Sequence, residues 1–129
     1  MAKSFVIEDA VRSAAADAMT ALVDAGGGAG YIKYYDVSNN VLATQPFGAT
    51  AFGNAAAGVC TKNAIANVTV AASGTVTYYK FFNFANTLIA TGTVGTSGAN
   101  MNFNVVVWLL GATVEITTLT WSQTSTSTQ

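Results

Sequence analysis

The stretch that decides the fold is GTVTYYKFFNF, residues 74–84, in which β-branched and aromatic residues form an unbroken run. Such residues are enriched in strands because their side chains pack well on a pleated surface. This run is the strongest strand signal in the chain. NFAN, residues 83–86, ends it with turn-forming residues, and TLIATGTVG, residues 87–95, returns as a second strand. The pair predicts a fold built around β-structure.

Towards the C-terminus, TGTVGTSGAN (residues 91–100) is a turn between strands. We expect Gly95 and Gly98 to supply positive φ there. Residues 100–104 then alternate strictly, with Met101 and Phe103 on one face. VVVWLLG, residues 105–111, is apolar throughout, so we expect it to be covered on both sides. Residues 113–121 alternate again: Val114, Ile116 and Leu119 are expected on the buried face.

Towards the N-terminus, residues 31–36 and 41–44 are strand candidates joined by the turn DVSNN, and Pro46 marks an edge strand or a break. Residues 47–58 are rich in glycine and alanine and predict irregular structure, followed by two short strands. About eight short strands result, the pattern of an antiparallel β-sandwich or jelly-roll-like domain. We expect one domain over residues 1–129, with the β-sandwich at 30–121 and a flexible tail at 122–129.

The segment before the strands, residues 5–25, is rich in alanine and predicts one N-terminal α-helix with Ser4 as its N-cap. The glycines at 26–28 are expected to end it. One apolar stripe recurs at spacings of four and three; its members are Ile7, Val11, Ala14, Ala18 and Leu22. The stripe fits a helix folded onto its own sheet, or one that docks on a partner.

The amino-acid composition limits the classes of function that the chain can have. Hydrophobic residues make up 51% of the chain and charged residues only 9%, against about 25% charged in ordinary soluble domains. Thr (18), Asn (10) and Ser (8) supply neutral polarity instead. Such a surface suits a protein packed against neighbours, or a stable extracellular β-protein. The five cations are scattered, which argues against nucleic acid as a partner. Neither a membrane span nor a secretory signal is predicted.

The chain lacks the residues that common catalytic and metal sites need. It has no histidine, one cysteine and no Gly-Lys pair for a phosphate-binding loop. We expect Cys60 to be a buried structural thiol, and Asp9, Asp17 and Asp24 to solvate one face of the helix. We therefore predict no enzyme activity, no catalytic residue, no metal site and no cofactor.

The aromatic residues remain as contact candidates. Tyr and Trp pack in cores, anchor protein interfaces and stack on sugars. We consider all three roles, in that order, for the tyrosines and for Trp108 and Trp121.

Five segments in order resemble a widespread family of small virion proteins of tailed bacteriophages. The likeness runs over residues 8–121, although the aromatic block at 78–84 is richer here. The segments are DAVRSAAADAMTALVDAGGGAGYIKYYD, AFGNAAAGVCTKNAI, ASGTVTYYKFFN, LIATGTVGTSGANMNFN and TVEITTLTW.

This resemblance implies a structural component of the virion, assembled in the host cytoplasm. The expected role is a decoration or cement protein bound to the major capsid protein. The alternative is a neck, tail or baseplate adaptor or tip protein that could bind carbohydrate. Closed symmetry is common among identical chains, and decoration proteins often lie where capsomers join, so the resemblance implies a homotrimer. The candidate partner contacts are Tyr78, Tyr79, Phe82, Phe84 and Trp121.

Overall fold

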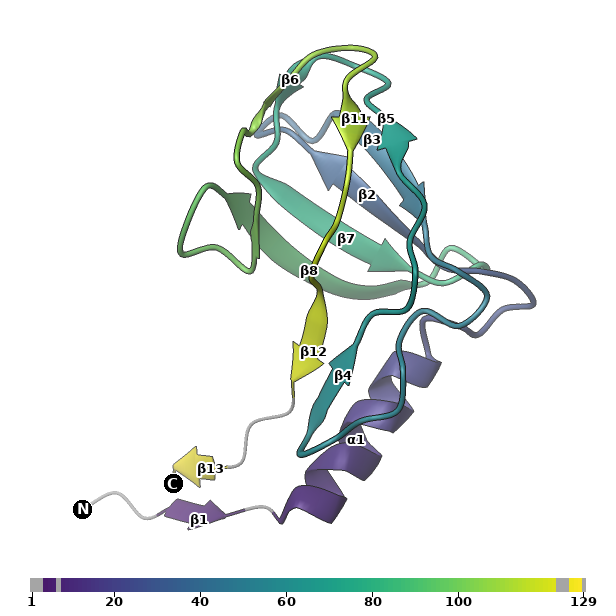
Figure 1. The fold of residues 1–129 in the computed structure, drawn as a ribbon, viewed down its shortest axis with the longest axis vertical. Helices are drawn as coiled ribbons and strands as arrows, with labels where there is room; N and C mark the ends of the chain where they lie inside the picture. Colours follow the sequence, from purple (N-terminus) through teal and green to yellow (C-terminus); the bar gives the residue numbers. More distant parts are fainter. Residues whose placement is uncertain (1–3, 7, 123–125, 129) are drawn as a thin grey trace.

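The structure, a computed structural model, describes residues 4–6, 8–122 and 126–128. It is mainly β with one helix near the N-terminus, as predicted (Figure 1). The main sheet contains β2 (Tyr31–Tyr35), β3 (Val41–Pro46), β7 (Tyr78–Phe82), β8 (Leu88–Gly95) and β9 (Met101–Asn102). Its strand order is β3-β2-β7-β8-β9, and every neighbouring pair is antiparallel except β8-β9.

Six short strands form a second layer. These are β4 (Val59–Thr61), β5 (Val68–Thr69), β6 (Gly74–Thr75), β10 (Val107–Trp108), β11 (Thr113–Val114) and β12 (Thr120–Ser122). They pair as β4-β12, β5-β11 and β6-β10, all antiparallel. The last two pairs share one register, and the register of β4-β12 differs from it by one residue. Hydrogen bonds continue between the pairs, from Lys62 N to Leu119 O at 2.9 Å and from Val70 N to Ala112 O at 2.7 Å. The six strands are therefore one interrupted ribbon of residues 59–75 against 107–122, and it crosses one side of the main sheet (Figure 1).

The predicted strand at 74–84 is divided between the two layers. Gly74 and Thr75 belong to the ribbon, whereas residues 78–82 form the centre of the main sheet. The chain changes partner in between: the amide of Val76 donates to Val106 and the amide of Thr77 to Tyr35. β-Propensity identified residues 74–75 and 78–82 correctly as strand, but it carries no information about where a strand ends or changes sheets.

The ribbon joins the main sheet along β3. The amide of Ala71 donates to Leu42 O at 2.7 Å. The side chain of Gln45, which is fully buried, accepts from Tyr34 Oη at 2.6 Å and donates to Ala66 O at 3.1 Å. Pro46 ends this edge strand, as predicted. Side chains from the inner face of the sheet and from the ribbon fill the core between the layers, including Ile32, Tyr34, Leu42, Phe81, Val94, Trp108, Val114, Ile116 and Leu119.

The loop at 96–100 differs from a simple turn between antiparallel strands. β9 returns parallel to β8, with Val94 beside Met101. The side chain of Asn100 makes this possible, because its Oδ1 accepts from the amide of Thr93 at 3.0 Å. Gly98 has the expected positive φ of 71°, whereas Gly95 does not have a positive φ.

The helix is shorter than predicted. α1 spans Asp9–Ala21, with Glu8 as its N-cap, because Ser4 lies in β1 (Ser4–Val6) instead. β1 pairs with β13 (Thr126–Thr128), so part of the expected flexible tail is a strand. Residues 123–125 and 129 of that tail lie outside the described residues.

The helix buries a different face from the predicted one. Ala16 and Thr20 are buried, whereas Val11 is 60% and Leu22 54% exposed, and Ala14 and Ala18 are also exposed. Ile7 lies outside the described residues. The helix does fold onto its own chain, against β4 and β12, but it turns the predicted apolar stripe to the outside. Hydrogen bonding along the other face explains this choice.

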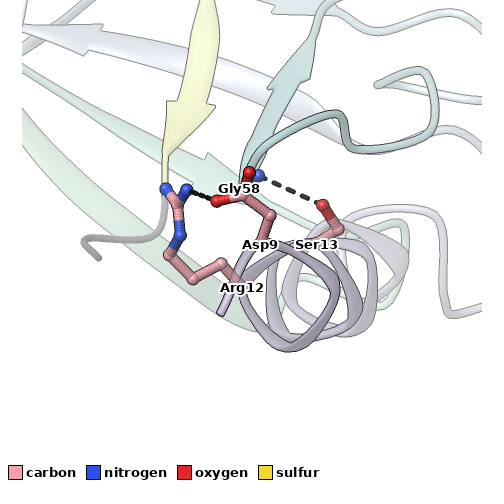
Figure 2. A network of polar contacts seen from close by, with 4 residues as sticks. All are labelled: Asp9, Arg12, Ser13 and Gly58. Carbon is pink, nitrogen blue, oxygen red and sulfur yellow. Dashed lines mark hydrogen bonds and ion pairs between the residues drawn. The ribbon is translucent and has the colours of Figure 1, made fainter. Parts of the chain in front are cut away.

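Polar side chains on the inner face of α1 and in the turn that follows it hold the irregular segment before β4. Asp17 Oδ1 accepts from the amide of Ala55 at 2.7 Å, and Asp24 Oδ1 accepts from the amide of Ala51 at 2.8 Å. Figure 2 shows Ser13, whose hydroxyl accepts from the amide of Gly58 at 3.1 Å. Asp17 and Asp24 therefore do not merely solvate the helix, as expected from the sequence. They satisfy backbone donors of a segment that has little regular structure.

Asp9 has a different environment from these two carboxylates. It forms an ion pair with Arg12 one turn along the helix (Figure 2), and its own side chain is 72% exposed. Of the three aspartates, this one does have the solvated position that the sequence predicted.

The expectation for residues 105–111 is wrong. Only Val107 and Trp108 form a strand, and Val105, Val107, Leu109 and Leu110 are each at least 60% exposed. Trp108 is buried, with its ring edge-on to that of Tyr34 at 5.1 Å, and Val106 packs partly buried against the core. An apolar run does not distinguish a strand covered on both sides from an exposed loop.

Candidate functional site

The outer face of the main sheet, away from the ribbon, carries an ordered set of aromatic and lysine side chains. We call it the aromatic–lysine face; it consists of Tyr31, Lys33 and Tyr35 from β2 and Tyr78, Lys80 and Phe82 from β7. Alternation along each strand places these residues on one face, because successive side chains point to opposite sides of a sheet. The antiparallel register then sets Tyr31 opposite Phe82, Lys33 opposite Lys80, and Tyr35 opposite Tyr78.

The four rings form two stacked pairs with the lysines between them. Tyr35 and Tyr78 lie 4.8 Å apart and nearly parallel, at 4°. Tyr31 and Phe82 lie 5.3 Å apart at 18°. Cross-strand aromatic pairs of this kind stabilise a sheet by roughly 0.2–1 kcal/mol.

Each lysine lies over one of these pairs. Lys33 Nζ is 5.6 Å from the centre of the Tyr31 ring and 5.7 Å from that of Phe82. Lys80 Nζ is 5.2 Å from the centre of the Tyr35 ring and 5.8 Å from that of Tyr78. The negative face of a ring attracts an ammonium group at such distances. The two like charges therefore point to opposite ends of the face.

Turns at both ends of the sheet hold one ring of each stacked pair by a hydrogen bond. The hydroxyl of Tyr31 donates to Asn86 Oδ1, and the hydroxyl of Tyr78 donates to Asn39 Oδ1. Asp36 closes the turn that carries Asn39: its Oδ1 accepts from the amides of Ser38 and Asn40, both at 2.9 Å. The hydrogen bond from the Asn40 side chain holds the pKa of Asp36 below its usual range. The face is thus organised before any partner arrives.

This arrangement suits binding to another macromolecule. Rigid rings contribute contact area at little cost in conformational entropy, and tyrosine is enriched in protein interfaces. Two ammonium groups between the rings favour carboxylate or carbonyl groups on the partner.

Two observations concern metal binding and the one cysteine. No group of three or more His, Cys, Asp or Glu side chains in the described part of the chain is placed to hold a metal ion. Cys60 is fully buried; its thiol lies 3.8 Å from Thr20 Oγ1 and 3.7 Å from Asp17 Oδ1. Burial raises the pKa of this thiol, which keeps it protonated and a poor nucleophile.

The structure separates the five predicted contact residues. Tyr78 and Phe82 lie on the aromatic–lysine face. Tyr79 points to the inner side of the sheet and Trp121 lies in β12 of the ribbon, and both line a groove between the two layers. Phe84, 56% exposed, lies in the turn after β7 and packs over Gly28.

Sequence reasoning missed Tyr31, Lys33, Tyr35 and Lys80 as members of one site. A signal was present: β2 and β7 both have the order aromatic, any residue, lysine, any residue, aromatic. Either motif alone is weak. Only the register of the two strands brings them together.

Comparison with protein-family models finds no match, and neither the curated proteins nor the solved structures include a significantly similar chain. Among the described helices, none has the length and apolar character needed to cross a membrane.

Proposed function

We propose that this chain is a non-enzymatic structural protein of a tailed-phage virion. It decorates the capsid by binding the major capsid protein through the aromatic–lysine face. The observation that carries this proposal is the face itself: two stacked ring pairs and two lysines, held rigidly on the centre of a sheet. The stacked rings also stabilise the sheet and Tyr35 is largely buried, but the lysines and the other three rings remain partly accessible on the side of the sheet away from the core.

The sequence supports the same function. The five segments that resemble small virion proteins run in order through almost the whole chain. Low charge reduces repulsion between copies packed side by side on a shell. We also propose that the sheet and the ribbon together form a sandwich or jelly-roll-like domain, the compact form that a decoration protein needs.

Contacts between copies complete the proposal. We propose a homotrimer, located in the virion after assembly in the host cytoplasm, that binds neither nucleic acid nor membrane and needs no cofactor. The exposed helix stripe, residues 11–22, provides an apolar surface for the contact between copies, with Val11 and Leu22 more than half exposed.

The alternative is a neck, tail or baseplate adaptor that uses the same face on a different partner. Copy number separates the two. A cement protein covers a lattice in hundreds of copies, whereas an adaptor or tip protein is present in about a dozen.

Binding to empty capsids of the phage that encodes this chain tests the proposed face. Lys33→Glu places a carboxylate between the stacked rings. We expect it to lower capsid affinity by about tenfold or more, which corresponds to about 1.4 kcal/mol. Lys62→Glu is the matched control, because it makes the same charge change outside the face and should bind as the unmodified protein does. Equal binding by all three proteins would refute the role of the face.

A further inference from the structure

The two layers leave a groove on the side opposite β3. There β8 and β12 lie across from each other without pairing, and a cavity of about 710 Å³ lies between them. The residues that line it include no charged side chain. The groove is separate from the aromatic–lysine face, since it opens on the inner side of the sheet.

One wall of the groove is an unpaired strand edge of β8. The amide of Val94 donates to Thr77 O at 2.9 Å, on the side of β7. Backbone groups alternate in direction along a strand, so those of Thr91 and Thr93 point away from β7. Thr93 N is bound by Asn100. β9 pairs with β8 only at Val94 and Gly95, so Thr91 presents its N–H and C=O to the groove.

The opposite wall is a second unpaired edge. Leu119 O accepts from the amide of Lys62, on the side of β4. By the same alternation, the backbone groups of Thr118, Thr120 and Ser122 point away from β4 and towards the groove. Among the described residues, β12 pairs with β4 alone.

The floor between these edges is apolar. Tyr79, Phe81, Met101 and Leu119 are buried there, and Trp121 lies beside Phe81 with 6.3 Å between ring centres. The walls carry small neutral side chains. A bound segment would therefore meet rows of backbone donors and acceptors on two sides and an apolar surface below.

We propose that this groove binds an extended, uncharged segment of another protein, which adds as a strand between β8 and β12. Strands lie about 4.8 Å apart, sheets pack about 10 Å apart, and each residue advances about 3.3 Å. Each residue of a strand thus occupies roughly 160 Å³, and the cavity holds about four or five residues. Alternate side chains of the segment, apolar and of moderate size, would contact the floor at Trp121 and Phe81. The inference does not depend on the proposed virion role.

Selection from a display library of random hexapeptides, with the folded chain as bait, tests the proposal. We expect enriched sequences to be uncharged and to alternate apolar with small polar residues. Synthetic peptides with the enriched sequences should change the fluorescence of Trp121 when they are added to a Trp108→Phe variant, in which Trp121 is the remaining tryptophan. N-methylation of alternate backbone amides should weaken binding at least tenfold, because it removes edge hydrogen bonds and keeps every side chain.

Two matched variants locate the site. Thr91→Pro removes the outward N–H and leaves the bonds to β7, so it should abolish peptide binding. Thr91→Val keeps that N–H and should bind as before. If Thr91→Pro does not fold, Thr120→Pro and Thr120→Val make the same comparison on the opposite wall.

Several outcomes would overturn the proposal. These are enrichment of no peptide, equal binding by the proline and valine variants, or indifference to N-methylation. Binding of a glycan probe that quenches Trp121 and competes with the peptides would make the groove a sugar site instead. Self-association that Thr91→Pro abolishes would identify a second copy of this chain as the occupant.

Discussion

Lys33 and Lys80 are direct cross-strand neighbours on β2 and β7, yet each ammonium group lies over a different stacked aromatic pair. Like charges placed directly opposite each other destabilise a sheet. The rings on either side offset this cost, because each attracts one cation away from the other. The result is an ordered face in which charge and aromatic area alternate along both strands.

This relationship predicts that the charge of Lys33 contributes to binding rather than to folding. Lys33→Glu loses a cation–π contact worth about 0.5–1 kcal/mol and gains an opposite-charge pair with Lys80 worth roughly 0.2–1 kcal/mol. We expect the free energy of unfolding in urea to change by less than about 1 kcal/mol. A much larger loss would mean that the lysine is needed for folding, and the capsid-binding result for that variant would then not report on the face.

The carboxylate of Asp17 is expected to stabilise the fold. Asp17→Ala leaves the part-buried amide of Ala55 without its partner, and a loss of about 1–2 kcal/mol is expected, because a fully buried unsatisfied donor costs about 1–3 kcal/mol. Asp9→Ala, in the same helix, removes an ion pair whose carboxylate is 72% exposed and a first-turn acidic residue, and should cost about 1 kcal/mol or less. Urea unfolding of both variants compares them. Equal losses would contradict the structural role assigned to Asp17.

Gly92 is expected to tolerate no side chain. A Cβ there would overlap the ring of Tyr79, which lies directly across from it on β7. Forcing extra atoms into a packed site costs typically about 1–3 kcal/mol, so Gly92→Ala should lower the melting temperature clearly.

Two controls accompany this variant. Gly53→Ala should be nearly neutral, since a Cβ there meets its nearest atom at 3.6 Å. Adding Tyr79→Val to Gly92→Ala should recover part of the loss. If the loss of stability in the double variant equals or exceeds the sum of the two single losses, overlap with Tyr79 is not the cause.

Stability is predicted to fall at alkaline pH. Burial raises the pKa of Cys60, Tyr34, Tyr35 and Tyr79 in the folded chain. In the unfolded chain these groups ionise near their ordinary values, about 8.5 for cysteine and 10 for tyrosine. The unfolded state therefore releases protons first, and stability is lost as pH rises above about 8.5.

Urea unfolding between pH 7 and 11 measures this loss. Tyr79→Phe should reduce the slope above pH 9 and change stability little at pH 7. A free energy of unfolding that stays constant up to pH 11 would show that these groups titrate normally in the folded chain.

The main features of the fold could be predicted from local patterns. The pattern at 113–119 identified Val114, Ile116 and Leu119 correctly as buried, and the turn at 83–86 was recognised from its composition. The ribbon could not be predicted, because its pairs join residues 32 positions apart (Thr75 and Val107) to 63 positions apart (Val59 and Ser122), with only two or three residues in each strand. Signals that short do not specify a partner.

The helix shows why an amphipathic pattern can mislead. Counting apolar residues selected Val11 and Leu22 as the buried stripe. The chain instead buries the face with Ser13, Asp17 and Thr20, because those side chains satisfy backbone donors and pack against Cys60. Hydrophobic periodicity takes no account of hydrogen bonds to a distant loop.

The candidate site was predictable only in part. Tyr78 and Phe82 were selected for their aromatic character, which does not reveal the side of the sheet. Their partners on β2 precede them by more than 40 residues, and the site exists only once Tyr35 and Tyr31 lie opposite them.

The number of copies of this chain in purified particles of the phage that encodes it tests the central claim most directly. Quantitative mass spectrometry against the major capsid protein gives that number. The account predicts hundreds of copies per particle, retained through purification and reduced by Lys33→Glu. A dozen copies or fewer would assign the chain to the neck or tail, and its absence from the particle would contradict a virion role altogether.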